Sequence, residues 1–313
     1  MIQFNVSPNV LWSLGGLYAI LVVASVFVAL IRWRAPERDR TELVQRIRSW
    51  WIIVTLFSAA MVMSRNLSIA FFAFVSFLAL KEYLSIIPTR RADRRVLFWA
   101  YLAIPVQYFW VAQAWYGMFI IFIPVYVFLC LPLRMVLIGD AKDFLRAAGT
   151  LHWGIMTLVF GISHIAYFLA LPEAKNPVAG GAGLVLFLVF LTEFNDVAQY
   201  VWGKALGRHK IIPKVSPNKT WEGFAGGVAT TTFLAVILSG WLTPMSWKMA
   251  VLAGLLISVA GFVGDVTISA LKRDIGLKDS GSMLPGHGGI LDRIDSLTFT
   301  APLFFHFIYY LYY

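Results

Sequence analysis

Apolar runs of about 20 residues recur from one end of this sequence to the other. An α-helix needs about 20 apolar residues to cross the ~30 Å hydrocarbon core of a bilayer. Of the 313 residues, 59% are hydrophobic and 13% are charged, whereas soluble domains carry about 25% charged residues. The sequence therefore predicts an all-α, polytopic integral membrane protein and excludes an ordinary soluble domain.

Ten of these runs are candidate membrane spans, and the second, third and tenth are short enough to tilt or insert only in part. Their approximate bounds are 10–31, 50–64, 67–80, 96–113, 116–133, 150–171, 181–202, 223–242, 247–268 and 296–312. We expect six spans without a readable motif in residues 1–180. Residues 181–313 form a second membrane region with polar loops at 203–222 and 269–295.

The basic residues indicate how these spans are oriented. Lys and Arg concentrate in cytoplasmic loops of membrane proteins. With ten spans, all but three of the 26 Lys and Arg residues fall on one side, the exceptions being Arg65, Lys175 and Lys248. We therefore expect both termini outside and the two polar loops in the cytoplasm. In so apolar a chain, the net charge of +10 indicates loops and lipid headgroups, and no nucleic acid is expected.

The segment 269–295 combines acids, bases and glycines as a metal–phosphate site would. Glycines let backbone N–H groups approach a ligand, basic side chains bind phosphate oxygens, and carboxylates suit Mg²⁺. The charged residues and histidine of this segment, with Ser269, are Lys272, Arg273, Asp274, Lys278, Asp279, His287, Asp292, Arg293 and Asp295. The plain alternative is a solvated cytoplasmic loop.

Asp265 argues against that alternative, because it lies inside the ninth apolar run. An acid within a span is costly and usually functional. Asp265, Ser269 and Lys272 are spaced to share one helical face. The position of Asp265 therefore favours a site at the membrane boundary.

A second stretch, 193–227, contains acids on one face of the seventh span and a basic loop before the eighth. Glu193, Asp196 and Tyr200 share that face. Ser216, Lys219 and Thr220 precede the eighth helix, whose N-terminus favours an anion. Taken alone, this Ser-Pro-x-Lys-Thr pattern fits a capped helix start equally well.

Residues 190–295 resemble the phosphatidate cytidylyltransferases (CDP-diacylglycerol synthases). The segment 269–295 has the family's Ser, Lys-Arg, Lys-Asp, Pro-x-His-Gly-Gly and Asp-Arg-x-Asp positions. One departure is Gln199, where the family commonly has a small residue. The resemblance implies transfer of a cytidylyl group from CTP to phosphatidate, giving CDP-diacylglycerol and pyrophosphate, with one or two Mg²⁺ ions as cofactor.

Roles for the candidate residues follow as hypotheses from this resemblance. Asp265 and Asp292 lead as metal ligands, with Asp295 and Asp279 as second choices. The phosphates of CTP or the lipid are expected to be bound by Lys272, Arg273, Lys278 and Arg293. His287 is expected to contact phosphate or pyrophosphate. Nucleotide positioning is assigned to Ser216, Lys219, Thr220 and Ser269, while Asp196 would orient a lysine or a metal ion.

Two other functions stay open at this point. A relative acting on another lipid phosphate would show the same motifs, because acyl chains need only an apolar groove. A cation-coupled transporter would also carry buried acids such as Glu193 and Asp265. However, it would leave the dense polar loop without a role. The expected location is a bacterial inner membrane with the site facing the cytoplasm, and a homodimer is a further expectation.

Overall fold

The computed structural model describes residues 6–34, 41–90, 94–281, 283 and 288–313. In the N-terminal half the elements are α1 (Pro8–Arg34), α2 (Thr41–Val62), α3 (Arg65–Ile86), α4 (Arg94–Ala112), α5 (Tyr116–Ile121), η2 (Phe122–Val127), α6 (Phe128–Val136), α7 (Phe144–Ile155), η3 (Met156–Gly161) and α8 (Ile162–Phe168). The C-terminal half contains η4 (Glu173–Lys175), α9 (Gly180–Leu206), β1 (Lys210–Ile212), β2 (Ser216–Thr220), α10 (Trp221–Leu242), α11 (Trp247–Asp274), α12 (Leu291–Ile294) and α13 (Leu297–Tyr312).

Each of the ten predicted spans falls on a helical segment, which confirms the all-α membrane fold. Within the described residues, eight helices are long and apolar enough to cross a membrane. The two predicted spans outside this set are α2 and α13. Helix α13 has 16 residues, fewer than the ~20 that a perpendicular crossing needs. The span count of ten therefore stays a prediction.

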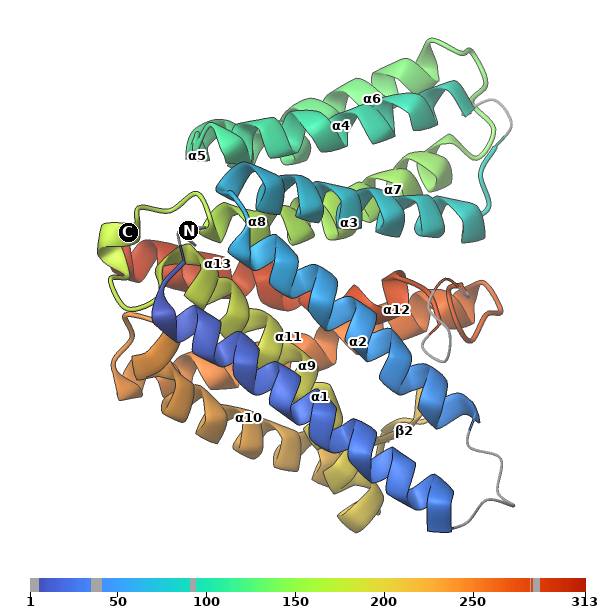
Figure 1. Cartoon of the computed structure of the whole chain (residues 1–313). Helices are drawn as coiled ribbons and strands as arrows, with labels where there is room; N and C mark the ends of the chain where they lie inside the picture. The colour runs from blue at the N-terminus through green and yellow to red at the C-terminus, as the bar shows by residue number, and fades with distance from the viewer. Residues whose placement is uncertain (1–5, 35–40, 91–93, 282, 284–287) are drawn as a thin grey trace.

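The helices form one bundle in which the C-terminal elements lie beside the middle of the chain (Figure 1). Helix α10 packs along α9 and α11, and α13 packs against both α11 and α8. Buried Phe304 and Phe305 anchor α13 by packing on Phe168 and, for Phe304, on Phe187. The division at residue 180 stays a prediction, and the contact between α13 and α8 crosses it.

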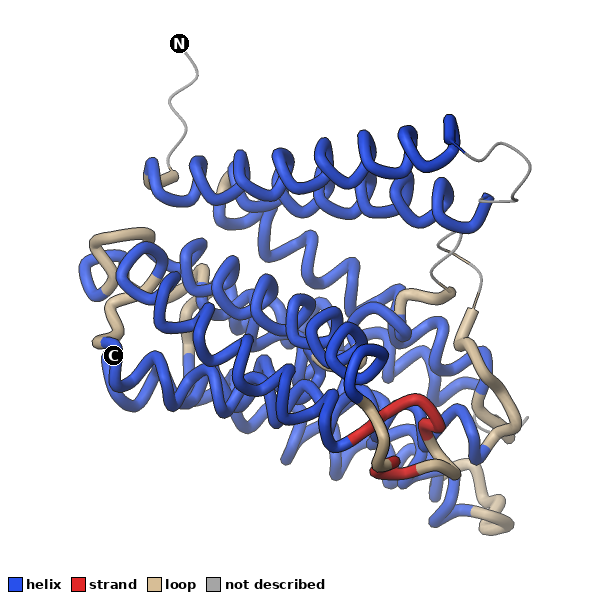
Figure 2. Tube along the Cα trace, turned by 90° about the horizontal axis from the view of Figure 1, so that it is seen from below, coloured by secondary structure: helices blue, strands red, loops and turns tan. Residues whose placement is uncertain are grey.

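One end of the bundle collects the polar elements. The β-hairpin and α12 lie there, whereas the start of α1 and the end of α13 lie at the opposite end (Figure 1). Figure 2 shows the two strands at the edge of the helical mass. This arrangement brings the two loops singled out by sequence to one face.

The loop bounds need correction. The segment 203–222 contains an antiparallel hairpin in which Lys210 pairs with Thr220 and Ile212 with Ser216. The segment 269–295 is also partly regular, because α11 continues to Asp274. Ser269, Lys272 and Arg273 thus lie on a helix, where α11 fixes their spacing relative to Asp265.

Candidate active site

Lys219 joins two acids from neighbouring spans. From the end of β2 its Nζ lies 2.5 Å from Asp265 Oδ2 on α11 and 3.7 Å from Asp196 Oδ1 on α9. Lys219 Nζ also donates to Gln199 Oε1 at 3.1 Å. The hairpin therefore places an ammonium between carboxylates of two membrane helices. This contact places a lysine beside Asp196, whose role in orienting a lysine or a metal ion stays a prediction.

Serines orient the same acids. Ser269 Oγ donates to Asp265 Oδ1 at 3.3 Å, one helical turn away, which confirms that these residues share a face of α11. Ser296 Oγ donates to Asp196 Oδ2 at 2.8 Å. Asp196 Oδ1 is buried and makes no hydrogen bond to any described residue. It is therefore an oxygen with capacity for a further ligand.

Asp295 adds a third carboxylate beside this pair. Its Oδ1 accepts the backbone N–H of Ser296 at 2.8 Å. Burial raises the pKa of Asp295 well above its usual range, and the negative charges of Asp265 and Asp196 raise it further. Three acids thus gather around the Lys219 ammonium, with Lys272 and Arg293 within electrostatic range of Asp295 and Asp196.

Lys272 and Asp292 form a second, more buried ion pair. Lys272 Nζ lies 2.6 Å from Asp292 Oδ1, and both side chains are nearly inaccessible to solvent. Asp292 Oδ2 accepts the N–H groups of Ser280 and Gly289, each at 3.0 Å. Burial by itself raises the pKa of Asp292, but these hydrogen bonds and the Lys272 charge outweigh it and lower the pKa overall. Asp292 is thus engaged by three protein donors.

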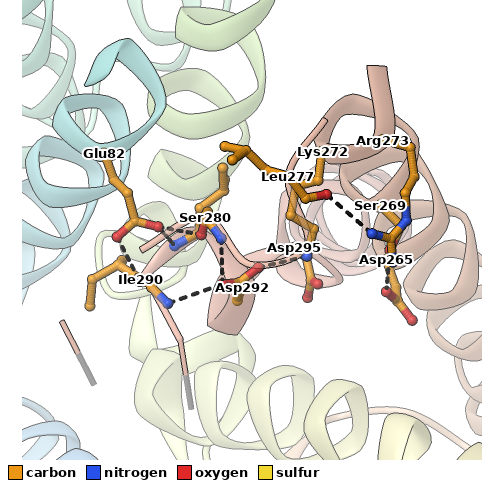
Figure 3. Close-up of polar contacts among 12 residues, drawn as sticks. Glu82, Asp265, Ser269, Lys272, Arg273, Leu277, Ser280, Ile290, Asp292 and Asp295 are labelled. Atoms are coloured by element: carbon orange, nitrogen blue, oxygen red, sulfur yellow. Dashed lines mark hydrogen bonds and ion pairs between the residues drawn. The ribbon is translucent and has the colours of Figure 1, made fainter. Parts of the chain in front are cut away.

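Glu82, on α3 of the N-terminal half, is the residue that sequence reasoning missed. Its carboxylate accepts the hydroxyl of Ser280 and the N–H groups of Ile290 at 2.9 Å and Leu291 at 3.1 Å (Figure 3). The available signal was an acid at the end of an apolar run, the same signal that drew attention to Asp265. The neighbouring Lys81 was counted only as a loop charge.

The glycines of the loop make room for these two carboxylates. A side chain at Gly289 would overlap Glu82, and one at Gly288 would lie 2.6 Å from Asp292 Oδ2. Gly288 also has φ +80°, a conformation that L side chains rarely adopt. The close backbone approach expected for phosphate is made here to the protein's own carboxylates.

The candidate residues of the hairpin have mainly structural contacts in the described chain. Thr220 caps α10, since its Oγ1 accepts the N–H of Gly223 at 3.1 Å, as the capped-helix alternative predicts. Ser216 opens β2 and is half-buried. Arg273 donates to Val215 O and Leu277 O, both at 3.2 Å, and so ties the hairpin to α11.

The remaining candidate residues are more exposed to solvent or lie outside the described residues. Lys278 and Asp279 are exposed and make no hydrogen bond or ion pair with described residues. Arg293 is half-buried, its Nε has no hydrogen-bond partner among the described side chains, and it is within electrostatic range of Glu193 and Asp196. His287 lies outside the described residues.

The described part of the chain contains no group of three or more His, Cys, Asp or Glu residues arranged to hold a metal ion. The acids nearest to such an arrangement are Asp196, Asp265 and Asp295, and Lys219 stands between the first two. Carboxylate oxygens are the donors that Mg²⁺ prefers. The residue types therefore fit a magnesium ion, although the metal assignments stay predictions.

Comparison with known proteins identifies relatives over most of the chain. A model of the cytidylyltransferase family matches residues 44–311. The chain is 49% identical over 298 residues to the uncharacterized protein YnbB of Escherichia coli (strain K12), covering 95% of this chain and 98% of that protein.

Proteins named phosphatidate cytidylyltransferase match over a shorter region. The Bacillus subtilis (strain 168) protein is 43% identical over 147 residues, covering 46% of this chain and 52% of its own length. A Staphylococcus epidermidis protein of the same name is 35% identical over 156 residues, covering 48% of this chain and 59% of its own length. These matches span only about half of each curated enzyme. Together with the family match, they show that this integral membrane protein is a nucleotidyltransferase of the cytidylyltransferase family.

Proposed function

We propose that this protein transfers the cytidylyl group of CTP to phosphatidate, giving CDP-diacylglycerol and pyrophosphate. The observation that carries this proposal is the ammonium of Lys219 held between Asp196 and Asp265. It lies beside a loop that positions a second lysine, Lys272, on Asp292. Paired cations and acids at the end of membrane helices suit a reaction between an anionic nucleotide and an anionic lipid.

The bond changes in this reaction are simple. A phosphate oxygen of the lipid forms a bond to the α-phosphorus of CTP, while the bond from that phosphorus to the bridging oxygen of the β-phosphate breaks. Pyrophosphate leaves with the electron pair. An ionised phosphate is already a nucleophile, so no general base is needed. Catalysis then depends on positioning and charge stabilisation.

The chain's own residues supply part of that stabilisation. Lys219 and Lys272 reduce the repulsion between the two reactants, while Asp196 and Asp265 keep the Lys219 ammonium in place. When bound, Mg²⁺ would supply positive charge that stabilises the phosphate groups as they react. Asp265, Asp196 and Asp295 are the acids with which this chain would hold it. Lys278, Arg273 and Arg293 remain candidates for phosphate contacts.

The expected location is a bacterial inner membrane with this site facing the cytoplasm and both termini outside. The end of the bundle with the hairpin and α12 supports this orientation, since the basic loops belong to it. CTP would enter from the aqueous side and the lipid from the bilayer. A homodimer stays a prediction.

The test is an assay of purified protein in detergent micelles with labelled CTP, Mg²⁺ and a panel of lipid phosphates. We expect CDP-lipid and pyrophosphate to form in equal amounts, with phosphatidate as the best acceptor. Preference for a prenyl-glycerol phosphate would keep the reaction and change the substrate. Absence of both products with every lipid phosphate would refute the proposal.

A further inference from the structure

Ser280 and the stretch 289–291 are held between two carboxylates that come from opposite halves of the chain. Asp292 receives the N–H groups of Ser280 and Gly289 from one side. Glu82 receives the Ser280 hydroxyl and the N–H groups of Ile290 and Leu291 from the other. Figure 3 shows both carboxylates meeting at these residues, which are called the anchored segment below.

Glu82 binds the anchored segment through neutral donors alone, whereas Asp292 also pairs with the Lys272 ammonium. The Glu82 side chain is 8% exposed, and no lysine or arginine of the described chain forms an ion pair with it. Carboxylates accept only, and each oxygen has two lone pairs. Oε1 accepts from Ser280 and Leu291, and Oε2 accepts from Ile290. The three donors thus use both oxygens of the carboxylate at this point of α3.

The contacts of Glu82 with the anchored segment also affect the Lys272–Asp292 ion pair. Ser280 contributes its hydroxyl to Glu82 and its N–H to Asp292, so one residue connects the two acids. Leu291 binds Glu82 and directly precedes Asp292. A displacement of the anchored segment from Glu82 would therefore move the carboxylate on which Lys272 is positioned.

We infer that Glu82 is a positioning residue of the cytidylyl transfer site, acting from α3 through the anchored segment on Asp292 and Lys272. This inference rests on the proposed function for its activity readout. It gives the N-terminal half, which carries no sequence motif, a defined part in the reaction. The contact is made by a single carboxylate 198 positions from Ser280.

The test compares Glu82→Gln with Lys81→Gln, a change one residue away on an exposed position of the same helix. The amide that replaces the carboxylate cannot accept from all three donors, so at least one of them loses its partner. We expect hydrogen exchange at Ile290 and Leu291 to rise about tenfold, and kcat to fall about tenfold, with Lys81→Gln unchanged. If Glu82→Gln folds poorly, Ser280→Ala takes its place in the test. It removes one donor only and should show the same pattern more weakly.

A double variant separates positioning from general stability. Glu82→Gln added to Asp292→Asn should lower kcat by less than about twofold beyond Asp292→Asn alone, because both act through one segment. Unchanged exchange at Ile290 and Leu291, or fully multiplicative losses in the double variant, would overturn the inference. If the wild-type protein makes no CDP-lipid, the proposed function fails, while the exchange measurement still decides whether Glu82 holds the anchored segment.

Discussion

Asp292→Asn is the substitution whose outcome the structure predicts most sharply. Asparagine keeps one acceptor oxygen and replaces the other by an NH₂ donor. If the oxygen faces Lys272, the NH₂ meets the N–H groups of Ser280 and Gly289, and two buried donors lose their acceptor. If the amide turns over, the NH₂ meets the buried Lys272 ammonium instead. Neither orientation satisfies all three donors.

The loss of folding free energy is set by whichever of the two amide orientations is less unfavourable. Each buried donor left unpaired costs about 1–3 kcal/mol, and a buried charge that loses its partner costs about 3–5 kcal/mol. We therefore expect Asp292→Asn to destabilise the folded loop by about 3 kcal/mol, a factor of about 100 in its opening equilibrium. Lys272→Met added to this variant should recover part of the loss. The amide oxygen can then accept both N–H groups, and the NH₂ no longer faces an ammonium.

The assay is unfolding by SDS in mixed micelles, in the presence of a chelator, for the two single variants and the double variant. The expected result is a double variant more stable than the sum of the single losses predicts, with kcat lowered but measurable in every variant that lacks the pair. An Asp292→Asn protein of wild-type stability that needs much more Mg²⁺ for activity would refute this reasoning. That outcome would make Asp292 a metal ligand, as the sequence suggested.

Two further predictions concern the acids around Lys219. Lys219→Met removes the cation that lies 3.7 Å from Asp196 and closer still to Asp265. At an effective dielectric constant near 20, such a charge contact contributes about 4 kcal/mol before the cost of desolvation is subtracted. Thermal unfolding in detergent should show lower stability with chelator, partly restored by Mg²⁺, and equal stability would contradict the ion-pair role. The raised pKa of Asp295 means that ionisation opposes folding, so wild-type stability should fall as pH rises above the ordinary aspartate range. Asp295→Asn should be the more stable protein near pH 7 in chelator and should match the wild type at about pH 4, and a lower melting temperature near neutral pH would count against this electrostatic account.

Most of the helices and part of the site could be predicted from sequence for physical reasons. Apolar length is a local property, and each of the ten apolar runs falls on a helical segment of the described chain. The spacing of Asp265 and Ser269 along α11 is also local, and their hydrogen bond follows from it. The family resemblance placed Lys219 and Asp265 in one site, although their direct contact was not predicted. These features depend on short-range geometry or on a known pattern.

The interpretation of the glycines was harder because it depends on partners distant in sequence. A loop rich in glycine and lysine predicts a phosphate nest, and nothing local distinguishes a phosphate from a protein carboxylate. Glu82 reaches Ile290 from 208 positions away. Gln199, a departure from the family pattern, is 3% exposed and shares Lys219 with the two acids. Its amide nitrogen has no hydrogen-bond partner among the described residues.

The distribution of hydrogen-bond donors over the acids indicates where a metal–nucleotide would enter. Glu82 and Asp292 each receive three protein donors, so both are engaged in holding the loop. Asp196 retains a buried oxygen without a hydrogen bond to the described residues, and it shares one ammonium with Asp265. Asp295 lies close enough for its proton affinity to rise with their charge. Since carboxylate oxygens that are not fully engaged by protein donors can still ligate a divalent cation, we expect Asp196, Asp265 and Asp295 to bind it in preference to Asp292.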